Sequence, residues 1–425
     1  MAMTHKKYVL LKASLPFVLL AAIVVGLYFL LFAPKDYADL VPADARAVLT
    51  VEPSALLAND MRLGNMLSSQ LGFRPEGLDE SQDVYIFITP SEYFAVCAPL
   101  HDGRRLSEQF RRLSKSGQAE LLPRSDQLAW AWLKTGWLVA WNSNACLALG
   151  PGLVQERDVM RQAMAQLFSS SSRSSFRHSG HQALLDDVKG NLRLYSHLTA
   201  LPSPFSMLFR VDVPQGCKDG KVVLVAGAEI AFSGKEADGV TMEGRLTSED
   251  DDTRSLLEAS DTSRHPLAEP LRPYAPDNCV LYLAAHSEGD QLLSLLRSDQ
   301  NVRTMLLTLD KSIDTERLKS RGGDFFLTLD ALPKDADVRF RLCIQQADSI
   351  QYDEHTMPQP PAIAPSALTD KATGKRAFFT LNVASLLQQT GLEGGVAQTL
   401  SRLLGHTKRI SYVASERHRF QLTIE

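Results

Sequence analysis

The sequence has few of the residues that catalytic and metal-binding motifs require. Its 425 residues include five cysteines, Cys97, Cys146, Cys217, Cys279 and Cys343, and no CxxC pair. Neither a zinc site nor a thioredoxin-like motif is therefore supported, and we expect buried thiols. The sequence also has no GxSxG elbow, no P-loop and no supported SxxK set. These absences favour a protein with no catalytic residues, no cofactor and no metal site.

Positive charge is not in excess either. The chain has 45 Lys and Arg against 49 Asp and Glu, which gives a formal net charge of -4. A protein that neutralises many phosphates needs a basic surplus, so we expect no nucleic-acid partner. A hydrophobic content of 44% and a charged content of 22% are ordinary for a globular protein.

The sequence has one long apolar run, at residues 13–32, and no charged side chain interrupts it. Twenty helical residues span about 30 Å, the thickness of a bilayer core. Lys6, Lys7 and Lys12 precede the run. This lysine excess predicts a cytoplasmic N-terminus at 1–12, a single-pass helix in the inner membrane and a periplasmic body. The alternative is a cleaved signal peptide, but the run is too long and no small-x-small site follows it directly.

A weak internal repeat is the main organising feature of the chain. Residues 46–57 and 376–387 align without a gap, and Arg, Ala, Thr and both leucines coincide. Residues 278–297 show the same short buried strand followed by a helix, and residues 191–198 give a fainter fourth copy. Two strands of alternating polarity, separated by a short polar tip, follow each copy. The sequence therefore predicts a β-α-β-β unit used about four times.

The repeat predicts the fold class and the domains. Strands of alternating polarity bury one face only, so we expect an α+β fold: after the transmembrane helix, β-α-β-β units form largely antiparallel sheets covered by helices on one face. A single unit buries too little to be stable, so the units should pair. We expect a first domain at 36–250, with an insertion at about 100–189, and a second domain of two units at 266–425. The polar stretch 248–265 separates them.

Residues 40–48 carry a Leu-Val-Pro-Ala-Asp-Ala-x-Ala-Val pattern between the apolar run and the repeats. This arrangement resembles a family of exported Bacteroidetes proteins of unknown function, some membrane-anchored and many lipoproteins. The Asp-Ala-Leu-Pro segment at 330–333 fits loosely, and the chain departs from the lipoproteins because no cysteine follows its apolar run. The resemblance covers most of the chain after residue 36. It implies a Gram-negative cell-envelope location and supplies no catalytic residues.

All four tryptophans lie within twelve residues: Trp130, Trp132, Trp137 and Trp141. The segment predicts a hairpin that turns near 134–135. A two-residue turn would pair Trp132 with Trp137 and place all four rings on one face, whereas a three-residue turn would split them between faces. A one-sided set could be a platform for a glycan, a peptide or a partner protein. The alternative is core packing beneath the inserted region.

Three further patterns have simple interpretations. Residues 322–326 resemble the GGDEF signature of diguanylate cyclases, but Phe325 stands where the second acid is needed, so we expect a glycine turn before a strand. The His-Ser-Gly-His segment at 178–181 has metal-ligand spacing but no third histidine, which favours a solvated loop. Residues 104–115 form a basic amphipathic helix that could lie on anionic lipid, although packing on a sheet is the commoner arrangement.

These observations predict a non-enzymatic, membrane-anchored envelope protein whose periplasmic body binds an envelope protein or a surface polymer such as a glycan. The four tryptophans are its candidate binding residues. The alternative is an envelope hydrolase or another enzyme with a site assembled across the repeat units. A deep pocket with convergent His, Asp or Ser would favour the enzyme, and a shallow apolar surface would favour binding. A third possibility is a structural spacer.

Overall fold

The structure is a computed structural model. It describes residues 36–53, 73, 75–125, 127–201, 221–233, 236–263, 266–267, 279–287, 323–329, 340–346, 349–352, 371–372, 374–383 and 408–425, together with 206, 209–210, 213–214, 216–218 and 220.

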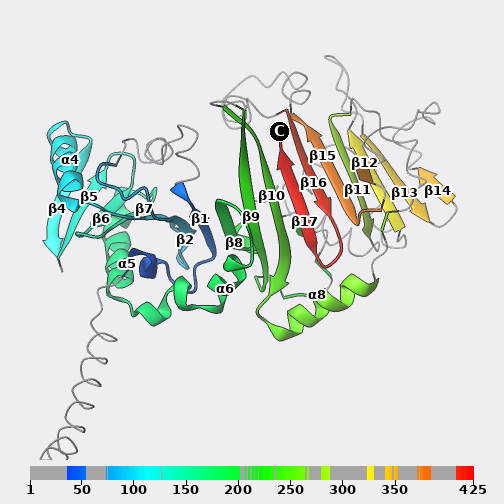
Figure 1. The fold of residues 1–425 in the computed structure, drawn as a ribbon, viewed down its shortest axis with the longest axis horizontal. Coiled ribbons are helices and arrows are strands. Elements are labelled where there is room, and N and C mark those ends of the chain that lie inside the picture. The colour runs from blue at the N-terminus through cyan, green and yellow to red at the C-terminus, as the bar shows by residue number, and fades with distance from the viewer. Residues whose placement is uncertain are drawn as a thin grey trace, which may run out of the picture.

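The described elements are mostly strands (Figure 1). The strands are β1 (Ala47–Val51), β2 (Val84–Ile88), β3 (Phe94–Pro99), β4 (Ala119–Ser125), β5 (Leu128–Leu133), β6 (Leu138–Trp141), β7 (Ala145–Leu149), β8 (Leu192–His197), β9 (Val222–Ser233), β10 (Glu236–Ser248), β11 (Leu281–Ser287), β12 (Gly323–Leu329), β13 (Phe340–Gln346), β14 (Ser349–Tyr352), β15 (Ala377–Asn382), β16 (Arg409–Ala414) and β17 (Arg419–Ile424). The α-helices are α4 (Gly103–Lys115), α5 (Arg157–Ser169), α6 (Gly180–Asp186) and α8 (Asp251–Ser263). Short 3-10 turns are η1 (Tyr37–Leu40), η2 (Val154–Glu156), η3 (Ser172–Ser174), η4 (Phe176–His178) and η5 (Leu198–Ala200).

The described strands form one 17-stranded sheet in which every pairing is antiparallel. Following the pairings from one edge to the other gives the order β4-β5-β6-β7-β3-β2-β1-β8-β9-β10-β17-β16-β15-β11-β12-β13-β14. Figure 1 shows this sheet running across the whole molecule, with α8 below its C-terminal half.

The strand order follows the internal repeat. Numbered in chain order, the first repeat contains β1, β2 and β3, and the second, which is the faint copy at 191–198, contains β8, β9 and β10. The third repeat contains β11, β12 and β13, and the fourth contains β15, β16 and β17. The first strands of neighbouring repeats pair with each other, as β1 with β8 and β11 with β15. The two halves of the sheet then join through the third strands of the second and fourth repeats, because β10 pairs with β17. The hairpins expected after each repeat copy are present.

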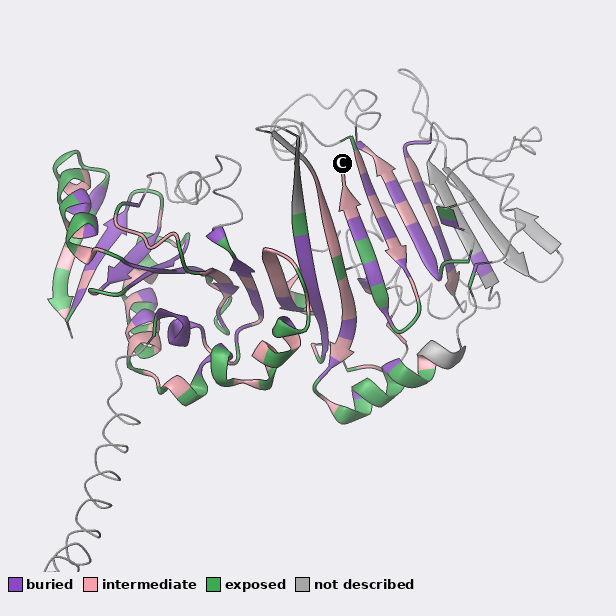
Figure 2. Ribbon diagram, in the orientation of Figure 1, coloured by how far each residue is buried: buried purple, intermediate pink, exposed green. Residues whose placement is uncertain are grey.

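The alternation of apolar and polar residues along the strands determines which side chains are buried. In β17, Phe420 and Leu422 are buried, whereas Arg419 and Gln421 are exposed (Figure 2). Successive side chains of a strand point to opposite faces, so β17 places one row in the core and the other in solvent. One core cluster spans both halves of the sheet, because it contains Leu246 together with Phe420, Leu422 and residues of β15 and β16.

The predicted α+β class, with helices covering one face of the sheets, is wrong. A continuous antiparallel sheet dominates, and helices lie on both of its faces where the inserted region adds β4 to β7. Phe110 of α4 packs in the cluster that contains Ala131, whereas Met160 of α5 packs in the cluster that contains Trp130. Neighbouring strand residues face opposite sides, so α4 and α5 cover opposite faces. The domain division at 248–265 stays a prediction.

The predicted single-pass placement in an inner membrane, with a cytoplasmic N-terminus and a periplasmic body, is also corrected. Among the residues that the structure describes, no helix is long and apolar enough to cross a bilayer. The helix predicted at 13–32 and the basic segment 1–12 lie outside those residues.

Candidate functional site

A cavity of about 470 Å³ opens where the β16–β17 turn meets the start of β15. We call it the basic pocket, and define it by its lining residues: Pro266, Gly374, Lys375, Arg376, Ser415, Glu416, Arg417 and Arg419. Four of these side chains are cations and one is a carboxylate. The whole chain carries a net charge of -4, so this concentration of positive charge is a local departure from its composition.

Two backbone segments fix the floor of the basic pocket. The Leu267 amide donates to the Lys375 carbonyl at 2.7 Å, and the Gly374 amide donates to the Leu267 carbonyl at 3.1 Å. The Arg376 amide donates to the Ala414 carbonyl at 3.1 Å, which continues the β15–β16 ladder by one residue. Segments from three distant parts of the chain therefore converge on one site.

The β16–β17 turn forms the opposite wall, and its conformation is unusual. Arg417 and His418 have φ values of 58° and 52°. Two successive positive φ angles are the pattern of a type I′ turn, which strongly favours Asn and Gly. Bulky side chains at such positions persist only when the surrounding structure holds them there, and such strain is concentrated at functional sites.

His418 is the group that holds the turn. It is 4% exposed, and its Nε2 lies 2.7 Å from the carbonyl oxygen of Leu257 and 3.3 Å from Oγ of Ser260. Both partners belong to α8, so the turn is attached to this helix. Arg417, the preceding residue, is exposed and lines the basic pocket.

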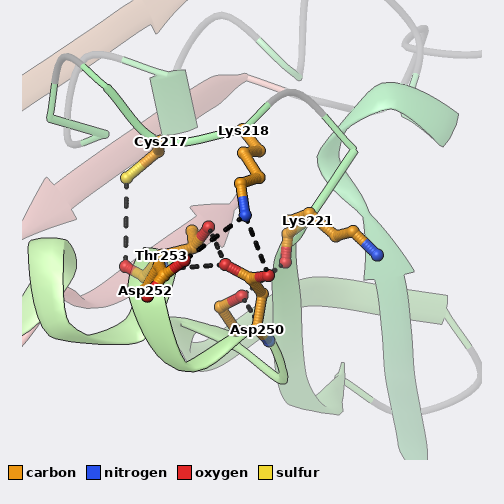
Figure 3. Close-up of polar contacts among 7 residues, drawn as sticks. Cys217, Lys218, Lys221, Asp250, Asp252 and Thr253 are labelled. Atoms are coloured by element: carbon orange, nitrogen blue, oxygen red, sulfur yellow. Dashed lines mark hydrogen bonds and ion pairs between the residues drawn. The ribbon is translucent and has the colours of Figure 1, made fainter.

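The N-terminus of α8 is fixed in turn by a polar cluster, shown in Figure 3. The Asp250 carboxylate accepts hydrogen bonds from the Thr253 amide at 2.9 Å and from its hydroxyl at 2.8 Å. These two bonds, with Lys218 Nζ at 3.3 Å, lower the pKa of Asp250 to about 2. Ser248 Oγ also donates to the Lys221 carbonyl at 2.9 Å. The cluster is a helix cap that joins the 217–221 segment to α8.

The first repeat has a turn of the same length at the corresponding place. The Arg46 amide donates to the Ile88 carbonyl at 2.9 Å, as the Arg376 amide does to the Ala414 carbonyl. Three residues then separate Thr89 from Tyr93, as three separate Ser415 from Arg419, and each pair is closed by an N–H···O=C bond. Arg46 therefore corresponds to Arg376.

The two turns differ in charge. In the first repeat the third turn residue is Glu92, with a φ of 67°, and its carboxylate forms an ion pair with the Arg46 guanidinium. In the fourth repeat that position is His418, which points into the core, and Tyr93 is replaced by Arg419. Within the described residues no ion pair joins Lys375 or Arg419 to a carboxylate of this chain. The arrangement suits an anion that comes from outside the chain.

The structure places the four predicted binding tryptophans in the interior. Trp130, Trp132, Trp137 and Trp141 are 1%, 7%, 2% and 3% exposed. Leu133 pairs with Trp137 across a three-residue turn, so the rings divide two to each face. Core packing, the alternative interpretation, describes this arrangement, and the two-residue turn is not formed.

The solvated loop expected at the His-Ser-Gly-His segment is wrong, because His178 ends η4 and His181 lies in α6. His178 lies 3.4 Å from Asp39, whereas His181 forms an ion pair with Glu249, so the two imidazoles face different carboxylates. No group of three metal-ligating side chains occurs in the part of the chain that the structure describes. β12 begins at Gly323, and the next residue, Asp324, lies 2.8 Å from the imidazole of His286. No disulfide joins the described cysteines, three of which are buried.

The basic helix α4 packs on the sheet. The ring of Phe110 stacks on that of Trp141 with centroids 4.6 Å apart, and Leu106 is fully buried. The charged side chains Arg104, Arg111 and Lys115 lie on the exposed side. This is the amphipathic surface helix that the commoner interpretation expects.

Comparison with known proteins adds little. No protein-family model matches the sequence, and no curated protein matches it. Crystal form IV of TP0453 is similar with a TM-score of 0.31 and 12% identity, over 51% of this chain and 81% of that chain. Form III gives 0.30 and 11%, over 54% and 87%. Similarity at this level supplies no argument about function, and the Bacteroidetes resemblance stays a prediction.

Proposed function

We propose that the protein is a non-enzymatic binding protein that captures an anionic group of a partner protein in the basic pocket. The observation that carries the proposal is the gathering of four cationic side chains and one carboxylate around a single cavity, in which neither Lys375 nor Arg419 forms an ion pair with a carboxylate of the described residues. A carboxylate from a partner would contact the cationic side chains that line this cavity.

The chemistry of the lining supports binding rather than catalysis. Guanidinium groups present paired N–H donors that match the two oxygens of a carboxylate, and they remain charged at every physiological pH. The residues that line the pocket include Ser415 and one carboxylate, Glu416, but no histidine, and no hydrogen bond among the described residues joins the Ser415 hydroxyl to the Glu416 carboxylate. Ser415 Oγ instead donates to the Arg419 carbonyl at 3.3 Å.

The test is the affinity of full-length protein for fluorescein-labelled hexaglutamate, measured by fluorescence anisotropy. The double variant Lys375→Gln/Arg417→Gln should weaken binding about tenfold, which corresponds to about 1.4 kcal/mol. Arg111→Gln/Lys115→Gln removes the same charge from the exposed side of α4 and is the matched control. It should leave the affinity within about twofold, because exposed charges at a distance are largely screened.

Equal losses in the two double variants would show that hexaglutamate responds only to overall charge, and would contradict the proposal. Unchanged affinity in the Lys375→Gln/Arg417→Gln variant would contradict it as well. Thermal unfolding of each variant separates loss of binding from loss of structure.

A further inference from the structure

A second group of positive charges adjoins the basic pocket on the sheet face over β10 and β17. Arg245 and Arg419 stand directly opposite each other in the antiparallel register of these strands. Opposed residues have Cβ atoms about 4.5–5.5 Å apart, and like charges at such positions repel. Arg419 also lines the basic pocket, so this pair continues the pocket onto the sheet.

A carboxylate of the described residues offsets this repulsion at Arg245 but not at Arg419. Arg245 Nη2 lies 3.0 Å from Asp187 Oδ2, at the C-terminal end of α6. Asp187 is 62% exposed, so solvent and salt screen this pair. In the described part of the chain no carboxylate forms an ion pair with Arg419. Among the described residues this like-charged pair is compensated at Arg245 alone, and local conflicts of this kind are expected at functional sites.

The polar character of the same face limits how far an anion can extend. The next cross-strand pair is Glu243 with Gln421, and Gln421 Nε2 donates to Glu243 Oε1 at 3.4 Å. The Glu243 carboxylate would repel a further negative charge. The favourable region therefore runs from Arg417, through Arg419, to Arg245 and ends there.

We propose that the anion bound in the basic pocket belongs to an acidic segment of a partner protein, with a second carboxylate between Arg245 and Arg419. This inference rests on the proposed function and names its ligand: a segment with at least two carboxylates, rather than an isolated small anion. One carboxylate would contact Lys375 and Arg417, and the next would offset the repulsion of the arginine pair.

Two probes and two variants test the inference on full-length protein. The probes are hexaglutamate, which is long enough to reach Arg245 from the basic pocket, and inorganic phosphate, which is too small to span both. Arg245→Gln should weaken hexaglutamate binding about threefold, and leave phosphate affinity unchanged. Asp187→Asn removes the internal competitor for Arg245 and should strengthen hexaglutamate binding about twofold. A gain of affinity cannot arise from misfolding.

Each other outcome is decisive. If Arg245→Gln and Asp187→Asn change neither affinity while Lys375→Gln/Arg417→Gln weakens both, the extension is wrong and the basic pocket stands. If no variant changes either affinity, the pocket and its extension both fail. If Arg245→Gln weakens phosphate and hexaglutamate equally, its effect is one of general charge and the extension is overturned.

Discussion

The β2–β3 turn of the first repeat and the β16–β17 turn of the fourth have the same length and carry opposite charge. Both follow a strand whose last carbonyl accepts from an arginine amide, and both span three residues. In the first, Glu92 neutralises Arg46. In the fourth, Arg417 and Arg419 join Arg376 around a cavity of about 470 Å³. Turns of equal length in two repeats can therefore differ in charge: an ion pair closes the first, whereas cationic side chains line a cavity beside the fourth.

The largest expected effect is on the free energy of unfolding, and it compares the contacts that fix the two turns. His418→Ala removes a buried imidazole that contacts the Leu257 carbonyl, and should lower the free energy of unfolding by about 2 kcal/mol. Glu92→Ala at the equivalent position removes only an exposed ion pair and should cost at most about 1 kcal/mol. Chemical denaturation of the two variants measures the difference, and equal costs would contradict the anchoring role of His418.

A smaller effect comes from the strained backbone. Arg417→Gly relieves a positive φ and should stabilise the protein by about 0.5–1 kcal/mol while it weakens hexaglutamate binding. Ser91→Gly, at the equivalent position of the first repeat, should instead destabilise the protein slightly, because it only adds freedom to the unfolded chain. Chemical denaturation of both variants measures the opposite changes in stability, and fluorescence anisotropy measures their affinity for hexaglutamate. A loss of stability in Arg417→Gly would show that the arginine supports the turn.

A still smaller effect would follow if the first turn were opened. Glu92→Gln leaves the Arg46 guanidinium without its carboxylate, and the first repeat should then bind inorganic phosphate weakly, in addition to the basic pocket. NMR titration of the Arg46 side chain should show phosphate-dependent shifts in the variant and none in the wild type. Shifts in both proteins would mean that Glu92 does not close the site.

The smallest effect is that of acid on the cap of α8. The pKa of Asp250 is lowered to about 2, so its stabilisation is present above its unfolded pKa near 3.8 and is lost as pH falls through the folded value. Asp250→Asn keeps a good cap without the ionisation and should flatten this part of the stability profile. Thermal unfolding from pH 5 to pH 2 tests it, and an unchanged slope in the variant would assign the acid sensitivity elsewhere.

The sequence predicts the local elements of this fold better than their assembly. Alternating residues such as Phe420 and Leu422 identify strands, and the copies at 46–57 and 376–387 identify equivalent strands. The register of the tryptophan hairpin could not be read, because the change from a two-residue to a three-residue turn depends on Gly136, whose φ is 84°. A shift of one residue moves every following side chain to the other face.

The basic pocket was not predicted because its residues come from three separate segments, at 266, 374–376 and 415–419. Their spacing along the chain matches no motif. One signal was present: Glu-Arg-His-Arg occupies a hairpin tip where small turn residues are expected. The aligned arginines, Arg46 and Arg376, would have shown which tip to compare with it.

The most direct test is a crystal structure of the full-length protein with hexaglutamate. We expect a peptide carboxylate in the basic pocket, about 2.7–2.9 Å from the guanidinium nitrogens of Arg417. A second carboxylate should lie between Arg245 and Arg419. A peptide bound at another surface, or a basic pocket that stays empty at saturating hexaglutamate, would contradict the assignment of this turn as the binding site.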